Sequence, residues 1–225
     1  MAESSTGIGA AEPRRVPTPP RVVAVSGMIF SALFTATLVL LRIAVPTDPA
    51  DSGDWLADPD LRNSVRTALS LVPFTGIAFL WYMGVLRNRI GELEDRFFAT
   101  VFLGSGLLFV AMLFTGTAVT QGLLDTFVTD ARLPAQSETY AVGRRTVYAL
   151  MTTFGLKMAA VFMFVTSMIG FRTGALSRWV TLVGFSFALV FLLAAASFPW
   201  LALLFPCWVM LVSTWILIVD VRQGL

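Results

Sequence analysis

The residues Trp179 to Val219 read WVTLVGFSFALVFLLAAASFPWLALLFPCWVMLVSTWILIV, a run of 41 residues without a charged side chain. At a rise of about 1.5 Å per residue, one helix of this length would measure about 60 Å, twice the thickness of a bilayer's hydrocarbon core. The run must therefore fold back on itself. Because proline readily begins or ends a helix, Ser197-Phe198-Pro199-Trp200 is the predicted break between two spans, 178–197 and 200–220.

Four further apolar segments are long enough to cross a bilayer. They cover residues 22–45, 65–86, 97–123 and 146–170. Of the 225 residues, 56% are hydrophobic and only 13% are charged, about half the charge of a soluble domain. The sequence therefore predicts an all-α, polytopic transmembrane helical bundle: residues 1–21 as a flexible cytoplasmic tail and 22–225 as a single six-helix domain.

The arginines set the predicted orientation, because cytoplasmic segments of membrane proteins carry an excess of basic residues. With both termini inside, the inner segments hold nine arginines and the outer loops hold five, namely Arg62, Arg66, Arg132, Arg144 and Arg145. The sequence therefore favours an N-in/C-in protein of the cell membrane.

The composition excludes most common mechanisms of catalysis. The chain has no histidine and one cysteine, Cys207, which lies in an apolar run. Histidine-ligated metals, the histidine general base and thiol redox pairs are thereby excluded. We expect no enzyme activity, no cofactor and no metal site.

Lys157 is the most unusual residue of the predicted spans, because it is the chain's only lysine. It lies 12 residues after Arg145 and 15 before Arg172, which places it close to the middle of a span bounded by those arginines. A charge at that depth is costly and marks a functional site by default. We expect its ammonium group to turn into the bundle.

The candidate polar site around Lys157 consists of hydroxyls. Thr146 and Thr153 share its predicted helix face, and Thr115 and Thr117 lie on the third span. Three states of the amine stay open: loss of its proton, binding by hydroxyls and carbonyls, and exposure to a wet cavity that admits an anion or a proton. A lysine satisfied by backbone carbonyls near a kink is the structural alternative.

Four other residues belong to the predicted outer surface. Arg42, near the end of the first span, is expected to extend to the outer headgroups. Arg144 and Arg145 are expected to anchor the fourth span at the interface or to contact lipid phosphate. Trp55, in an acidic loop, is expected to anchor at the interface.

Two stretches, Glu94–Gly106 (EDRFFATVFLGSG) and Arg172–Trp179 (RTGALSRW), resemble a group of uncharacterised bacterial multi-pass integral membrane proteins. Ser177 stands where that group would have a proline. The resemblance implies the structural class and a bacterial inner membrane, and it implies no activity.

Two functions fit these observations. The first is a structural, accessory or interaction bundle, which explains the lack of catalytic groups and of buried acids. The alternative is a small transporter or channel with an intramembrane polar centre at Lys157, and a dimer is one form that it could take. The predicted partners are the lipid bilayer and either another protein or a second copy of the chain, without nucleic acid.

Overall fold

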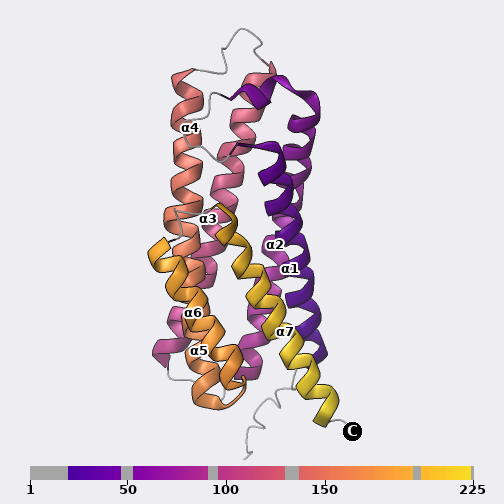
Figure 1. Cartoon of the computed structure of the whole chain (residues 1–225), viewed down its shortest axis with the longest axis vertical. Coiled ribbons are helices and arrows are strands. Elements are labelled where there is room, and N and C mark those ends of the chain that lie inside the picture. The colour runs from indigo at the N-terminus through magenta and orange to yellow at the C-terminus, as the bar shows by residue number, and fades with distance from the viewer. Residues whose placement is uncertain (1–19, 47–52, 91–95, 130–136, 195–198, 224–225) are drawn as a thin grey trace, which may run out of the picture.

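The computed structural model describes residues 20–46, 53–90, 96–129, 137–194 and 199–223, and in these residues it is helical without strands. Residues 1–19 of the predicted tail lie outside the described residues. The elements are α1 (Pro20–Ala44), η1 (Asp54–Ala57), α2 (Pro59–Ile90), α3 (Arg96–Thr129), α4 (Glu138–Tyr148), the π-helix η3 (Ala149–Gly155), α5 (Leu156–Thr173), α6 (Arg178–Ala194), η4 (Pro199–Leu203) and α7 (Leu204–Gln223) (Figure 1).

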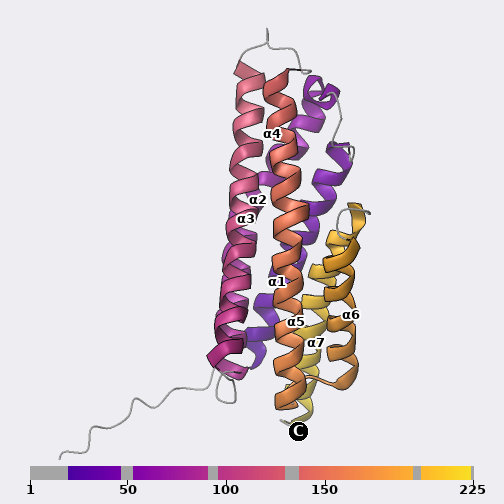
Figure 2. The same ribbon diagram turned by 90° about the vertical axis from the view of Figure 1, so that its left-hand side faces the viewer.

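Five helices of the described chain are long and apolar enough to cross a membrane, and α4, η3 and α5 together form one of them. Figure 2 shows α4 and α5 as one continuous column. The helix α6 has 17 residues and is shorter. Each of the six predicted spans thus has a helical counterpart, of which five satisfy the length that a span requires.

The helices form one elongated bundle with both ends of the described chain at the same end. The helix α1 lies along α2 and α7, and α5 lies along α3 and α6 (Figures 1 and 2). An ion pair of 3.9 Å joins Arg21, at the beginning of α1, to Asp220 near the end of α7.

The helices extend beyond the predicted spans where polar residues cap them. The helix α2 begins at Pro59 rather than at residue 65, because the Oδ1 of Asp58 accepts a hydrogen bond of 2.8 Å from the backbone N–H of Asp60. Proline suits the first helical position, since that position needs no N–H donor. The prediction was too short because hydropathy detects apolar side chains and not caps.

The turn between α5 and α6 is built from two capping interactions. Gly174 has a φ of 68°, and the N–H of Leu176 donates to the carbonyl of Gly170 at 3.3 Å, which ends α5. The hydroxyl of Ser177 accepts from the N–H of Val180 at 3.3 Å and so begins α6.

We expect Ser177→Ala to lower the free energy of unfolding by about 1 kcal/mol, because the substitution leaves a helix N–H without its cap. The measurement is an SDS titration of the protein in mixed micelles. Ser186→Ala, on the same helix but exposed, is the control. Equal stability of the two variants would show that the cap contributes nothing.

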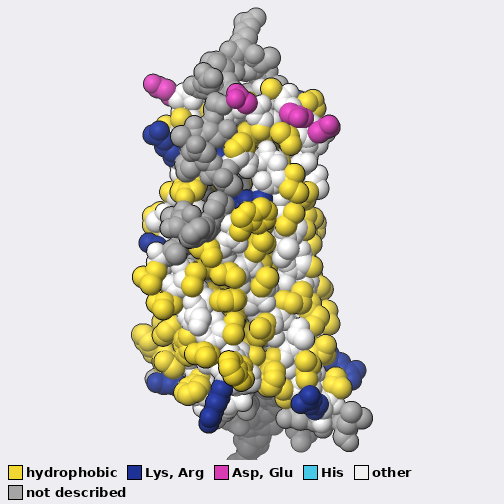
Figure 3. Space-filling model, in the orientation of Figure 1, with side chains coloured by type: hydrophobic (Ala, Val, Ile, Leu, Met, Phe, Trp, Pro, Cys, Tyr) yellow, Lys and Arg dark blue, Asp and Glu magenta, His cyan; other side chains and the backbone are white. Residues whose placement is uncertain are grey.

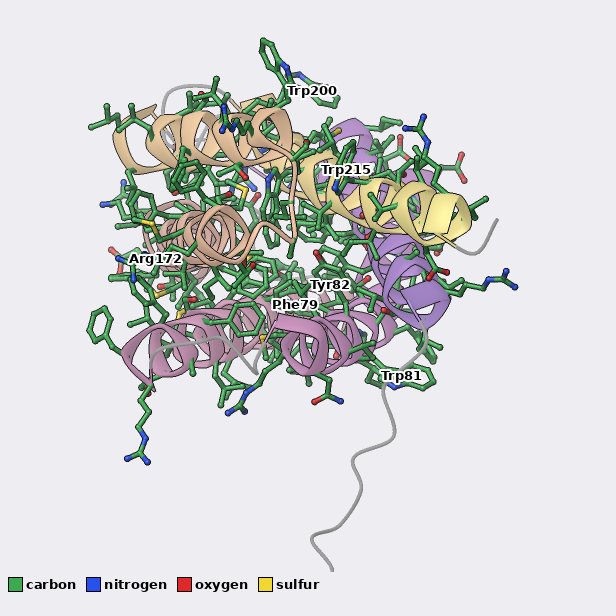
Figure 4. All side chains as sticks on the ribbon, turned by 90° about the horizontal axis from the view of Figure 1, so that it is seen from below. Phe79, Trp81, Tyr82, Arg172, Trp200 and Trp215 are labelled. Atoms are coloured by element: carbon green, nitrogen blue, oxygen red, sulfur yellow. The ribbon has the colours of Figure 1, made fainter. Side chains whose placement is uncertain are left out.

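The centre of the bundle is aromatic. Six phenylalanines from α1, α2, α3, α5 and α7 pack with neighbouring ring centroids 4.9 to 6.3 Å apart; they are Phe30, Phe34, Phe79, Phe109, Phe162 and Phe205. Seen from below, Phe79 and Tyr82 point inward, whereas Trp81 and Trp200 point outward (Figure 4).

The outer surface carries an apolar belt with charged residues at its ends. Hydrophobic side chains cover the middle of the face in Figure 3, acidic side chains lie at the upper end, and basic ones gather at the lower end. On α3 the exposed apolar side chains run from Phe97 to Phe114, about 26 Å of helix. Exposed polar residues follow from Thr115 onward. The belt therefore has about the height of a bilayer's hydrocarbon core.

Candidate functional site

A cavity of about 220 Å³, partly open to the outside, lies between α1, α3 and the continuous helix α4–η3–α5. Each helix contributes one stripe of side chains: on α1 and directly after its end, for example, these are Phe34, Thr37, Leu38, Leu41, Arg42 and Val45. Residues three and four apart share a helix face, so the stripe forms a continuous wall. The cavity thus extends about 16 Å along the bundle.

One end of the cavity is apolar and closed by the core. Phe34 and Phe109, two members of the aromatic centre, line it together with Leu113 and Leu156. Ala202 of η4 contributes from the side. Because these side chains are buried and packed, the cavity ends on a rigid floor.

The other end is covered by η1. Trp55 is buried there, and its indole N–H donates to the hydroxyl of Tyr140 at 2.8 Å. The ring of Phe127 packs edge-on against Tyr140 at 5.8 Å. The expectation that Trp55 anchors at the membrane interface is wrong, because the indole finds its hydrogen-bond partner inside the protein.

Two arginines lie at the covered end of the cavity. Arg42 comes from the last turn of α1 and Arg144 from α4, and both are half-buried. Arg144 donates to the carbonyl of Pro46, which holds α4 against the end of α1. Arg42 is close enough to Arg144 and to the hydroxyl of Tyr148 to interact electrostatically with both. Among the described residues, no Asp or Glu lines the cavity.

The π-helix η3 lies on the cavity wall. The N–H of Leu156 bonds to the carbonyl of Met151, five residues back, which is the wider π turn. In an α-helix, residues four apart drift by about 40° per step. Tyr140, Arg144 and Tyr148 lie on α4 before the wider turn, and Thr152 lies within η3; all four line the cavity. π turns occur frequently at functional sites.

The threonine hydroxyls of the wall are already engaged as donors. Thr117, Thr120 and Thr152 each donate to the carbonyl four residues back, at 2.7 to 2.8 Å. Their oxygens can still accept a hydrogen bond. The wall is therefore apolar with weak acceptors, and its positive charge is confined to the arginine end.

The structure does not bring the residues of the predicted Lys157 site together. Lys157, Thr153, Thr146 and Thr115 are exposed, whereas Thr117 is half-buried and lines the cavity. The hydroxyls of Thr146 and Thr115 donate to carbonyls of their own helices at 2.9 and 2.8 Å. The prediction that the ammonium group turns into the bundle is therefore wrong within the described chain.

The apolar belt explains the position of Lys157. On α5 the exposed phenylalanines run from Phe171 to Phe154, again about 26 Å. Lys157 is one helical turn inside the Phe154 edge. A flexible lysine stem reaches water or headgroups from there. Relative to this belt, Lys157 lies nearer the edge than the sequence-based estimate, because α4 continues about 24 Å beyond the belt to Glu138.

Sequence reasoning missed the cavity because its arginines are 102 residues apart, at Arg42 and Arg144. From the sequence, each of these two arginines is assigned to the membrane interface by itself, without the other. The one local signal is the spacing of four between Tyr140, Arg144, Tyr148 and Thr152, which places four polar side chains on one helix face.

Comparisons with protein-family models, with curated proteins and with solved structures found no match for this chain.

Proposed function

We propose that the chain is a multi-pass integral membrane protein that binds a hydrocarbon ligand from the bilayer in the cavity between α1, α3 and α4–η3–α5. The observation that carries the proposal is the cavity itself, whose walls are mainly apolar and whose floor is the aromatic centre. An apolar cavity of about 150 Å³ stays dry and takes up benzene. A cavity of about 220 Å³ has room for part of a hydrocarbon chain.

The orientation that we propose is N-in/C-in in a bacterial inner membrane. The arginine-rich end of the described bundle carries Arg21, Arg87, Arg96, Arg172, Arg178 and Arg222, and the positive-inside rule assigns that end to the cytoplasm. Arg42 lies 21 residues after Arg21, about 31 Å along α1. The arginine end of the cavity then lies on the outer side of the apolar belt, beyond the edge marked by Phe114 and Phe154.

The binding role agrees with an accessory or interaction bundle, in which the protein holds a lipid and performs no chemistry on it. A transporter built around Lys157 has less support, because that residue lies outside the cavity. A protein partner or a second copy of the chain stays a prediction.

We expect Thr117→Phe to abolish labelling of the cavity by a phosphatidylcholine with a photoactivatable diazirine in its acyl chain. The phenyl ring would fill the space beside Leu113 and Met151. The full-length protein in nanodiscs is illuminated, and the labelled residues are found by peptide mass spectrometry.

The control is Thr115→Phe, which removes a similarly bonded hydroxyl two residues away but adds its ring to the exposed face of α3. It should leave cavity labelling at the wild-type level. If the wild-type protein is labelled only on outward-facing residues such as Phe114 and Phe164, the proposed function is wrong.

A further inference from the structure

We propose that the protein withdraws one hydrocarbon chain of a membrane phospholipid from the bilayer and holds it in the part of the cavity that projects beyond the apolar belt. This inference rests on the proposed function and adds to it the place where the chain is bound, which is outside the lipid layer.

The first support is the edge of the apolar belt. The outermost exposed aromatic side chains are Phe74 on α2, Phe114 on α3 and Phe154 in η3. Beyond them the exposed surface carries charged side chains, and Figure 3 shows acidic ones at that end of the bundle. Charged residues are costly in hydrocarbon, so this part of the bundle lies outside the core of the bilayer. These exposed charged residues are Arg66, Asp125, Glu138 and Arg145.

The second support is the position of the cavity relative to this edge. On α3 the lining begins at Phe109, inside the belt, and reaches Leu123, nine residues and about 13 Å beyond Phe114. On the continuous helix α4–η3–α5 the lining reaches Tyr140, about 21 Å beyond Phe154. The cavity therefore begins near the edge of the belt and continues outward, away from the bilayer.

The third support is the chemistry of the outer part of the cavity. Apolar side chains of α2, α3 and α4–η3 line it, although water and not lipid surrounds the bundle at this level. Each methylene group that moves from water into apolar surroundings strengthens binding roughly fourfold. A hydrocarbon chain outside the bilayer is therefore held far better inside this cavity than on the surface of the protein. The apolar residues are Leu69, Leu123, Val147 and Met151.

The fourth support is the division of the buried apolar residues into separate clusters. One cluster contains Phe34 and Phe109, and another contains Trp55, Leu69 and Tyr140. Members of both line the cavity, which therefore lies between them. A hydrocarbon chain in this space joins the two clusters into one apolar core. The volume of about 220 Å³ is about half as large again as a cavity that holds one benzene molecule, so it suits one chain rather than two.

The test uses two phosphatidylcholine probes, with the diazirine either near the carboxyl end of one chain or at its terminal carbon. The full-length protein is placed in nanodiscs, and labelling is quantified at Leu69 and Leu123 inside the cavity and at Gln121, which is exposed at the same level of α3. We expect at least one probe to label the two leucines about tenfold more than Gln121, the factor that burial of two methylene groups provides.

Thr120→Phe should reduce the labelling of Leu69 and Leu123 by about tenfold, because its ring fills the outer part of the cavity. Labelling of Leu113 at the floor should stay at the wild-type level. The matched control is Ala118→Phe, which adds the same ring to the exposed face of α3 outside the cavity lining. It should leave the labelling of all three leucines unchanged.

The depth of the cavity is measured separately with a membrane-impermeant maleimide. Cys207 is exposed and is first replaced by serine. In that background Gln121→Cys should react with the maleimide in nanodiscs, whereas Leu108→Cys, exposed within the belt, should stay protected. Equal protection of both would place the cavity inside the bilayer and overturn the inference.

The labelling results separate this inference from the proposed function. Labelling confined to Phe109 and Leu113 at the floor would overturn the withdrawal of the chain and leave the proposed function standing. Absence of labelling at every residue of the cavity by both probes would overturn the two together.

Discussion

Phe79→Ala should lower the free energy of unfolding by about 2–3 kcal/mol, the largest effect that we expect from one substitution. Phe79 is fully buried, and its ring centroid lies 4.9 Å from that of Phe30, 5.1 Å from Phe162 and 5.3 Å from Phe109. In water-soluble cores such a truncation costs about 3–5 kcal/mol, part of it for transfer from water. Lipid tails are as apolar as the core, so only the lost packing counts here.

The control for Phe79 lies on the same helix. Phe74 is 62% exposed and faces outward, so Phe74→Ala leaves no cavity inside the bundle. Both variants are compared with the parent protein by SDS titration in mixed micelles. If Phe79→Ala is no less stable than Phe74→Ala, the aromatic centre does not hold the helices together.

Gly184→Val should destabilise the protein by about 1–3 kcal/mol, because α6 packs closely against α5 and α7 at this residue. A Cβ atom at Gly184 would lie 2.0 Å from the Oγ of Ser167 and 2.7 Å from the Nε1 of Trp208. The serine hydroxyl can rotate away, but the indole of Trp208 is fully buried and has no free space to enter. The helix α6 must therefore move outward.

Gly104→Val provides the matched control, since no atom outside its own helix turn lies within 4 Å of a Cβ at that position. The change in intrinsic helix propensity is the same for both glycines. The free energies of unfolding should differ by more than about 1 kcal/mol between the variants. Equal values would mean that α6 is not packed as described.

The sequence predicted the order of the long helices in the described part of the chain, because long apolar runs and a proline break leave few alternatives. The helix α6 ends at Ala194 and η4 begins at Pro199, beside the predicted break. The helix ends were harder to predict, since Asp58 and Ser137 cap α2 and α4 from polar loops. No pattern indicated η3, because its residues also suit an ordinary α-helix.

The orientation of side chains was the weakest prediction. In a water-soluble helix, polar residues mark the outer face, but here apolar residues cover all faces of most spans. The prediction that Lys157 points into the bundle rests only on the energetic cost of a charge inside the membrane. That argument fails when a lysine lies one helical turn from the edge of the apolar belt, because its flexible stem then lets the ammonium group reach water or headgroups without turning into the bundle.

The cavity could not be predicted from the sequence because it depends on tertiary contacts. Arg42 and Arg144 meet only when α4 packs near the end of α1, and Trp55 is buried only when Tyr140 is beside it. The prediction that Arg144 contacts lipid phosphate stays untested. The structure places this arginine beside a second one, at the head of an apolar cavity.

The most direct measurement is an experimental map of the protein in lipid nanodiscs. We predict an elongated density between α1, α3 and η3 that ends against Phe34. A cavity that has collapsed, or one that holds separate water peaks only, would contradict the account.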